Sequence, residues 1–263
     1  MIDELGRLVE NAKALVRDGY YAVPGETPRS PSFLELLGTS AQASDVVAEI
    51  KYASPTMSSG RTAADFDALL ARIVRVRPLG LSVLAEPRIF GGGVDLVRRA
   101  STKGLPVLFK DIVVDEAQIE AAKACGASAV LLIQRVYDRG HLDGSPQSLI
   151  DAAHDRDLDV FLEVHTLEEW DDAAATDADV LGINNRDLST MRVDLTTTPR
   201  ILSARYKYRP VIALSGMETR ADVEVMLRAG ADAVLVGTSI MDHENPAAKL
   251  EDLAHGSSDP RPR

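Results

Sequence analysis

Short apolar runs alternate with amphipathic stretches along the chain from residue 46 onward. The runs lie at 46–50, 81–86, 106–110, 129–134, 160–164, 180–184, 211–216 and 233–237. Nearly continuous apolar strands separated by helices are typical of a parallel sheet that is buried on both faces. Eight strand–helix units in a chain of about 250 residues predict an α/β fold, a single (β/α)8 or TIM barrel. A doubly wound open sheet is the alternative, but no G-x-G-x-x-G follows the first run.

The first 45 residues stand outside this repeat. They predict a helix over 2–17, a proline-rich connector over 21–32 and a short helix around 33–38. Because this segment has no strand of its own, we expect an N-terminal helical extension over 1–45 that packs on the barrel. The catalytic barrel is then expected over 46–254, and a polar, proline-rich, flexible tail over 255–263.

Composition narrows the possible partners. The chain has 263 residues, of which 45% are hydrophobic, and a formal net charge of −11. An acidic protein lacks the basic footprint that nonspecific nucleic-acid binding needs, so no nucleic-acid partner is expected. The N-terminus lacks the apolar region of a signal peptide, and no apolar run approaches about 18 residues, so we expect a cytoplasmic protein without a membrane partner. The single cysteine, Cys125, cannot form an internal disulfide and is expected to be a small buried residue on a helix.

Charged and polar residues interrupt the apolar runs near their carboxyl ends, where barrels of this kind carry their chemistry. These residues are Glu49, Lys51, Glu86, Lys110, Asp111, Gln134, Glu163, Asn184 and Arg186. The two-residue period of a strand places Glu49 and Lys51 on one side, and likewise Asn184 and Arg186. A charge inside an apolar strand is costly unless it is paired, so two lysines and three glutamates at one barrel mouth predict a catalytic site.

Small residues follow the last two strands. Ser215-Gly216 and Gly237-Thr238 place free backbone N–H groups on the two loops that commonly hold a phosphate in barrels. We therefore expect an anionic, phosphorylated small-molecule substrate. The glycines at 91–93 lack a following Lys-Ser/Thr, so they predict a flexible loop rather than a nucleotide site.

Neither a metal nor a cofactor is expected. The five histidines show no ligand spacing, and lysines at the mouth would repel a cation. His165 lies two residues after Glu163 and could reach the mouth, but a role at the start of the following helix is favoured.

The segments at these strand ends resemble indole-3-glycerol phosphate synthase of tryptophan biosynthesis. They are AEIKYASP (48–55), LAEPRIFGG (84–92), PVLFKDIVVDEAQI (106–119), EVHTLEEW (163–170), GINNRDLST (182–190) and VLVGTSIM (234–241). The order is that of the family, and PRSPSFLELL is similar to its pre-barrel segment. The resemblance implies a cytoplasmic carboxy-lyase that closes the indole ring of 1-(2-carboxyphenylamino)-1-deoxyribulose 5-phosphate with loss of carbon dioxide and water. Association with other enzymes of the tryptophan pathway is a further expectation.

The resemblance also implies a role for each residue. Lys110 would protonate the substrate ketone, Lys51 would contact the anionic substrate and act as a second acid during dehydration, and Glu163 would be the general base. Glu49 would orient the lysines, and Asn184 and Arg186 would hold the intermediate and an anionic group. Glu86 would complete the polar ring, and the phosphate would sit on Ser215, Gly216, Gly237 and Thr238. Positioned acid–base groups fit this chemistry, since each typically contributes ~10²–10⁴-fold.

Some positions depart from the family pattern. Leu214 stands where a glutamate usually precedes Ser215-Gly216, and Ile112 stands where an aromatic residue often packs on the substrate ring. The missing glutamate leaves two alternatives open: a related phosphate-binding barrel enzyme, such as an isomerase or aldolase, or a weakly active or non-catalytic paralogue.

Overall fold

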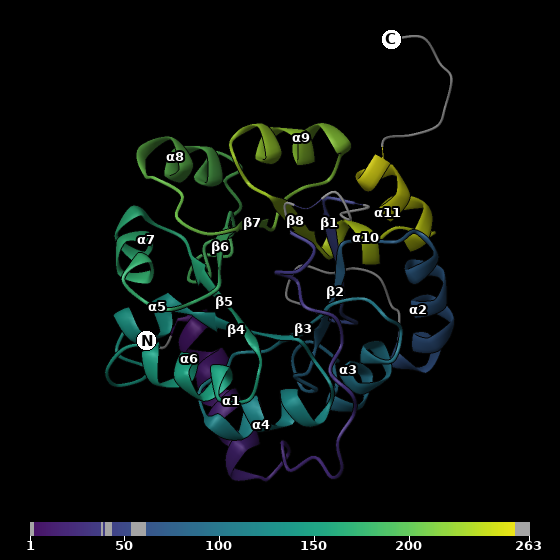
Figure 1. Cartoon of the computed structure of the whole chain (residues 1–263), viewed down its shortest axis with the longest axis vertical. Helices are drawn as coiled ribbons and strands as arrows, with labels where there is room; N and C mark the ends of the chain where they lie inside the picture. Colours follow the sequence, from purple (N-terminus) through teal and green to yellow (C-terminus); the bar gives the residue numbers. More distant parts are fainter. Residues whose placement is uncertain (1–2, 38, 40–43, 54–61, 256–263) are drawn as a thin grey trace.

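The protein is a closed barrel of eight parallel strands. The computed structural model describes residues 3–37, 39, 44–53 and 62–255. The strands pair in chain order, and β1 closes the ring by pairing with β8, with Val46 opposite Val234. Figure 1 shows this ring of strands with the helices around its outside. The strands are β1 (Val46–Ile50), β2 (Gly80–Leu84), β3 (Val107–Lys110), β4 (Ala129–Ile133), β5 (Asp159–Val164), β6 (Val180–Asn184), β7 (Val211–Leu214) and β8 (Ala233–Val236).

Helices surround the ring of strands (Figure 1); the first precedes β1, and the others follow the strands. They are α1 (Glu4–Arg17), η1 (Ala63–Asp65), α2 (Phe66–Arg75), α3 (Val94–Ser101), α4 (Glu116–Ala124), α5 (Gln134–Asp138), α6 (Gln147–His154), α7 (Leu167–Ala174), α8 (Thr197–Ala204), α9 (Arg220–Arg228), α10 (Thr238–Met241) and α11 (Pro246–His255). The predicted barrel is confirmed. The alternation of strand and helix identified it because each strand is apolar on both faces.

The two faces of the sheet bury two separate apolar cores. Outward residues such as Val46, Ala48 and Ile50 pack under the helices, while inward residues such as Val47, Leu108 and Phe161 fill the barrel. Because side chains alternate between the two faces of a strand, the residue two positions after an inward apolar residue also points inward, nearer the carboxyl end. Val47 is thus followed by Glu49, and Phe161 by Glu163.

Several predicted strands end earlier than expected. The runs at 81–86, 129–134, 211–216 and 233–237 end in strand structure at Leu84, Ile133, Leu214 and Val236. Glu86, Ser215 and Gly237 therefore belong to loops, and Gln134 begins α5. Apolar content marks burial rather than hydrogen-bonded strand, which explains the overlong predictions.

The N-terminal segment contacts the barrel at both ends. Leu8 of α1 lines the cleft at the carboxyl ends of the strands, while the buried Phe33 packs edge-on against Phe161 with ring centroids 5.1 Å apart. A Cβ at Gly80 would overlap the Phe33 ring. β2 therefore begins with a glycine at the point where Phe33 packs against the barrel. We propose on these contacts that residues 1–45 are an extension of the barrel and that the barrel itself spans 46–254.

Details at the termini differ from the prediction. The prediction of a short helix around 33–38 is wrong for the residues that the structure describes there. Phe33–Leu37 forms a single turn, in which the Leu37 N–H donates to the Phe33 carbonyl at 2.9 Å. Of the tail expected at 255–263, His255 ends α11 and the rest lies outside the described residues. Cys125 is buried at the end of α4. No helix in the described part of the chain has both the length and the hydropathy needed to cross a bilayer.

Candidate active site

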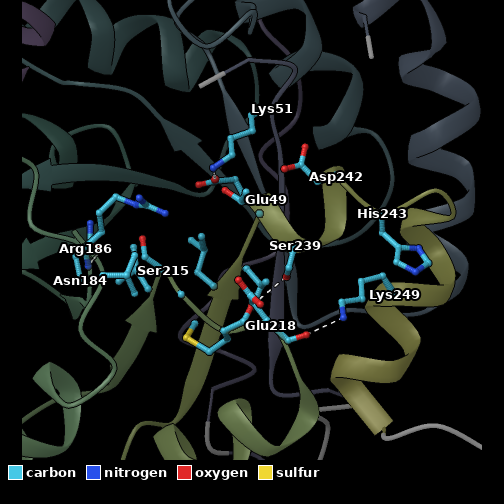
Figure 2. Close-up of a pocket in the computed structure, with 18 of the residues that line it drawn as sticks. Glu49, Lys51, Asn184, Arg186, Ser215, Glu218, Ser239, Asp242, His243 and Lys249 are labelled. Carbon is cyan, nitrogen blue, oxygen red and sulfur yellow. Dashed lines mark hydrogen bonds and ion pairs between the residues drawn. The ribbon is translucent and has the colours of Figure 1, made fainter. Parts of the chain in front are cut away.

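A cleft with two lobes opens at the carboxyl ends of the strands. The larger lobe has a volume of about 460 Å³, and the smaller has about 110 Å³. Both lobes are lined by the same six residues, which therefore form the wall between them: Glu49, Lys51, Lys110, Asn184, Arg186 and Ser215. Figure 2 shows the larger lobe, with Lys51 turned toward Glu49 and the Arg186 guanidinium pointing into the cavity. The structure thus brings together most residues expected from the strand ends.

Each lysine at the mouth lies beside one carboxylate. Lys51 Nζ is 2.9 Å from Glu49 Oε1, and Lys110 Nζ is 3.6 Å from Glu163 Oε2. Asn184 Nδ2 donates to Glu163 Oε1 at 2.9 Å. The side chains of the two carboxylates are at most 9% exposed, while the lysines reach 14% and 17%. The ammonium groups therefore lie on the solvent side of each pair, where a substrate would meet them first.

Burial and neighbouring charge act in opposite directions on these carboxylates. Burial opposes ionisation of Glu163, but Lys110, His165 and Asn184 outweigh it and lower the pKa of Glu163 to about 2. Burial likewise opposes ionisation of Glu49, but Lys51 and Lys110 lower its pKa below the ordinary value. Both carboxylates are therefore ionised at neutral pH and available as proton acceptors.

The smaller lobe is mainly apolar. Its lining away from the shared wall includes Leu8, Leu84, Phe90, Ile112, Ile133, Leu188 and Met191. Side chains from the N-terminal helix, from the ends of β2 and β4 and from the loops after β2, β3 and β6 converge here, so a flat apolar group would be enclosed from several sides. Leu8 was not anticipated from the sequence, because the amphipathic pattern of α1 does not show which part of the barrel it covers.

The larger lobe ends on the loops after β7 and β8. Ser215, Gly216, Gly237 and Thr238 all line it. Ser215 and Gly216 both have left-handed backbone conformations, with φ of 66° and 90°. A left-handed serine costs of order 1–3 kcal/mol and is a feature that clusters at functional sites. The strained turn exposes backbone at the end of the lobe, where an anion could be bound.

Gly237 makes room for Glu49. A Cβ at Gly237 would overlap Glu49 Oε1, so any larger residue would displace the carboxylate that pairs with Lys51. Lys249 lies farther out in the same lobe and donates to the Glu218 carbonyl at 2.7 Å (Figure 2). It ties α11 to the β7–α9 loop, a link between distant segments that no local pattern in the sequence signals.

Glu86 lies outside the lining of both lobes. Its carboxylate accepts from Asn11 Nδ2 at 2.9 Å and from three backbone N–H groups, those of Arg88, Ile89 and Phe90, at 2.6–2.9 Å. Four donors occupy both of its oxygens, so Glu86 fixes the β2–α3 loop and joins it to α1. The geometry does not support the expected contact with substrate.

His165 differs from the sequence interpretation. Thr166, not His165, caps α7, because its hydroxyl accepts the Glu169 N–H at 3.1 Å. The His165 ring is buried, with Nε2 3.3 Å from Glu163 Oε1 and Nδ1 3.0 Å from Glu169 Oε2. The four-residue spacing from His165 to Glu169 could have indicated that these side chains pair. The same residues also fit the start of a helix, which was the interpretation favoured from the sequence.

Leu214 lies between Asn184 and the loops after β7 and β8. It is 2% exposed, lies opposite Asn184 in the β6–β7 register and lines the larger lobe. The wall at this corner is therefore apolar. Among the described residues, no group of three or more His, Cys, Asp or Glu side chains is arranged to hold a metal ion.

Comparison with known proteins relates the chain to one family. The family model described as indole-3-glycerol phosphate synthase matches residues 8–253. The enzyme of that name from Caldanaerobacter subterraneus is 39% identical over 199 residues, covering 74% of this chain and 75% of the relative. Its counterpart from Koribacter versatilis is 38% identical over 231 residues, covering 86% of each chain.

Solved structures support the fold. The 3-hexulose-6-phosphate synthase from Salmonella typhimurium aligns with a TM-score of 0.63 at 16% identity, covering 80% of this chain and 96% of that one. The thiamine phosphate pyrophosphorylase from Pyrococcus furiosus aligns with a TM-score of 0.56 at 18% identity, over 79% and 92% of the two chains. At this identity the likeness concerns the barrel alone. The match of the family model over nearly the whole barrel, together with relatives of this identity and coverage, shows that the chain belongs to the indole-3-glycerol phosphate synthase family.

Proposed function

We propose that this protein is an indole-3-glycerol phosphate synthase, a carboxy-lyase of tryptophan biosynthesis. Its substrate would be 1-(2-carboxyphenylamino)-1-deoxyribulose 5-phosphate, which the enzyme converts to indole-3-glycerol phosphate, carbon dioxide and water. One observation carries the assignment: an apolar lobe and a lobe that ends on the loops after β7 and β8 meet at a wall that holds the Lys51–Glu49 pair and Lys110, with Glu163 beside Lys110 in the apolar lobe. The aryl ring fits the first lobe, the phosphate fits the second, and the reacting carbons lie between them.

The first step forms the new carbon–carbon bond. The ring carbon that bears the carboxylate attacks the ketone carbon, and Lys110 gives a proton to the developing alkoxide. Lys110 suits this role because its ammonium is held beside the buried Glu163 and yet remains partly exposed to the cleft. The carboxylate then leaves as carbon dioxide, and its electron pair restores the aromatic ring. This step takes up one proton, which solvent returns to Lys110.

The second step removes water. The new hydroxyl leaves with a proton from Lys51, and Glu163 removes a proton from the neighbouring methylene carbon, which completes the indole double bond. Glu49 holds Lys51 through the 2.9 Å contact, and Asn184 holds Glu163. Arg186 is partly buried, donates to the Met191 carbonyl at 3.0 Å and has no ion pair with any other described residue, so it can bind the substrate carboxylate. Ser215, Gly216, Gly237 and Thr238 would seat the phosphate.

The proposal extends to the partners of the protein and to its cellular compartment. We propose a cytoplasmic enzyme that associates with other enzymes of tryptophan biosynthesis and binds neither nucleic acid nor membrane. The net charge of −11 supports the last point, because a phosphate backbone or an anionic bilayer would repel an acidic surface. The local cations at the mouth are compatible with a small anionic substrate.

A turnover assay tests the proposed activity. Purified protein is mixed with the carboxyphenylamino substrate, and the fluorescence of the indole product is followed. We expect product to form with saturation kinetics. Absence of product at high enzyme concentration, with the substrate still bound, would instead indicate a non-catalytic paralogue in which Leu214 has replaced a needed carboxylate. A lysine adduct trapped by borohydride with a carbonyl substrate would indicate an aldolase.

A further inference from the structure

A line of alternating charges runs from the cleft to the surface behind β5. Its members, from inside to outside, are Lys110, Glu163, His165, Glu169, Arg135 and Asp187. Successive contacts along it measure 3.6, 3.3, 3.0, 2.6 and 2.9 Å. Only the two ends reach solvent appreciably: the side chain of Asp187 is 42% exposed and that of Lys110 is 17% exposed.

The interior of this line contains four charged or ionisable side chains, each at most 6% exposed. They are Glu163, His165, Glu169 and Arg135. If the imidazole is protonated, cations and anions balance one to one along the whole line. If it is neutral, Lys110 and Arg135 still pair with Glu163 and Glu169, and the surplus negative charge falls on the partly exposed Asp187. Two buried carboxylates then face an uncharged ring at 3.3 and 3.0 Å, whereas an imidazolium would attract both, so the geometry favours the imidazolium.

The imidazole ring is fixed from behind by Glu169. Oε2 of Glu169 accepts the backbone N–H of His165 at 2.6 Å and lies 3.0 Å from ring Nδ1. Oε1 of Glu169 accepts from Arg135 Nε at 2.6 Å. With Nδ1–H directed to Glu169, a neutral ring would present the lone pair of Nε2 to the Glu163 carboxylate, which is repulsive. A protonated ring presents an N–H there instead.

The two carboxylate oxygens of Glu163 have different surroundings. Oε1 accepts the Asn184 hydrogen bond at 2.9 Å and lies 3.3 Å from His165 Nε2, an ion-pair distance rather than a hydrogen bond. Oε2 is buried and has no hydrogen-bond partner among the described residues, with Lys110 Nζ at 3.6 Å. The oxygen that is left without a hydrogen bond is therefore the one directed toward the lysine that borders the cleft.

We propose that His165 is a positioning residue for Glu163: an imidazolium clamped between two carboxylates, which holds Oε1 and leaves Oε2 as the basic atom. This rests on the proposed function, because it assumes that Glu163 accepts a proton. The charged groups that face His165 directly are Glu163 from β5 and Glu169 from α7. Lys110 from β3 and Arg135 from α5 act on it through those two carboxylates. Burial alone would lower the pKa of His165, but Glu163 and Glu169 raise it above its ordinary value.

The protonation state can be measured without turnover. Nitrogen-15 NMR of the ring nitrogens distinguishes an imidazolium from either neutral tautomer, and the chain has five histidines. We expect one histidine to keep both ring nitrogens protonated at pH 8, and its resonance to vanish in His165→Asn. If that variant does not fold, Glu169→Gln should shift the same resonance. A His165 ring that titrates near the ordinary pKa of about 6.5 overturns the proposal.

The pH profile of kcat/KM tests the effect on Glu163. Removing the imidazolium in His165→Asn takes away an opposite charge, so the pKa of Glu163 should rise and the acidic limb should move up by about one pH unit. We expect kcat to fall more than KM changes. His154→Asn is the matched control, because His154 pairs with Asp179 on the outer surface at 2.9 Å and should leave the profile unchanged.

A double variant separates positioning from a general loss of structure. In a Glu163→Gln background, His165→Asn should have little further effect on kcat, because the residue it acts through is already gone. Equal losses in both backgrounds would overturn the proposal. Failure of the proposed function would appear differently, as no turnover by the wild type together with an intact imidazolium signal.

Discussion

Lys110 is the residue whose removal should affect the chemistry most directly. Lys110→Met keeps the length of the side chain and removes the proton donor, so kcat should fall by ~10²–10⁴-fold while KM changes much less. Steady-state kinetics of indole formation measure this. Lys123→Met is the control, because Lys123 pairs with Asp157 on the outer surface at 3.4 Å. An unchanged kcat in Lys110→Met would mean that another group supplies the proton.

Leu214 shows what a single apolar residue does to the electrostatics of the cleft. The side chain is buried opposite Asn184, whose amide donates to Glu163 Oε1 at 2.9 Å. A glutamate here would place another negative charge near Glu163, without a cation of its own. The corner is therefore apolar where the resemblance to the family implies a glutamate.

Leu214→Glu should reduce stability in a pH-dependent way. We expect the free energy of unfolding at pH 7 to fall by about 1–3 kcal/mol more than in Leu214→Gln, because only the glutamate buries a charge. Burial raises the pKa of the introduced carboxyl group, so the difference should shrink as the pH falls and this group becomes neutral. Denaturant unfolding at several pH values measures it. A difference that is constant with pH would show that the new carboxylate finds a partner or reaches solvent.

The β2–α3 loop is held by backbone hydrogen bonds, although its three consecutive glycines suggest a flexible segment. Gly92 N–H donates to the Glu86 carbonyl at 2.8 Å, and Gly93 N–H donates to the Leu84 carbonyl at 2.9 Å. A Cβ at Gly92 would overlap the Leu84 carbonyl oxygen, whereas a Cβ at Gly93 would have its closest contact at 3.6 Å. The three adjacent glycines therefore do not have equivalent roles.

Adjacent alanine substitutions test this difference. Gly92→Ala should lower the free energy of unfolding by about 1–3 kcal/mol, because the clash is with backbone and cannot be relieved by a side-chain rotation. Gly93→Ala should be nearly neutral, since its backbone is extended, with φ of 177°. Thermal or denaturant unfolding of the two variants decides it. Equal effects would show that the loop can rearrange.

Sequence patterns predicted the elements better than the contacts between them. The eight strands and the lysine–carboxylate pairs follow from the two-residue period and from polar residues at strand ends. The donors to Glu86 could not be predicted, because Asn11 lies far from it in sequence and three of the donors are backbone groups. His165 was misinterpreted for a related reason: its local pattern indicates a helix start, while its function depends on packing around β5.

At the scale of the whole molecule, buried ionisable groups determine how stability depends on pH. Asp111 is 3% exposed and accepts from Tyr21 Oη and from the Ile112 N–H, each at 2.7 Å. Burial raises the pKa of Asp111 to about 7, although these hydrogen bonds oppose the rise. The folded state therefore binds a proton that the unfolded state, with a pKa of about 3.9, releases.

Stability should therefore depend on Asp111 between about pH 4 and pH 7. A raised pKa contributes stability that is full below the unfolded value and is lost as the pH rises through the folded value. Asp111→Asn keeps the shape without the charge, so the wild type should lose stability relative to this variant as the pH rises through that window. Denaturant unfolding of both proteins from pH 4.5 to pH 8 measures the difference. Parallel curves would contradict the raised pKa.

The closure of the ring between β1 and β8 also constrains how the protein is made. The first strand receives its second neighbour only when residues 233–236 are available. Gly237 and Thr238, which would seat the phosphate, follow that last strand directly. During synthesis on the ribosome, the barrel therefore cannot close, and the phosphate seat cannot form, until residues 233–238 have been translated. A truncated product that lacks this segment would have an open sheet edge rather than a partly active site.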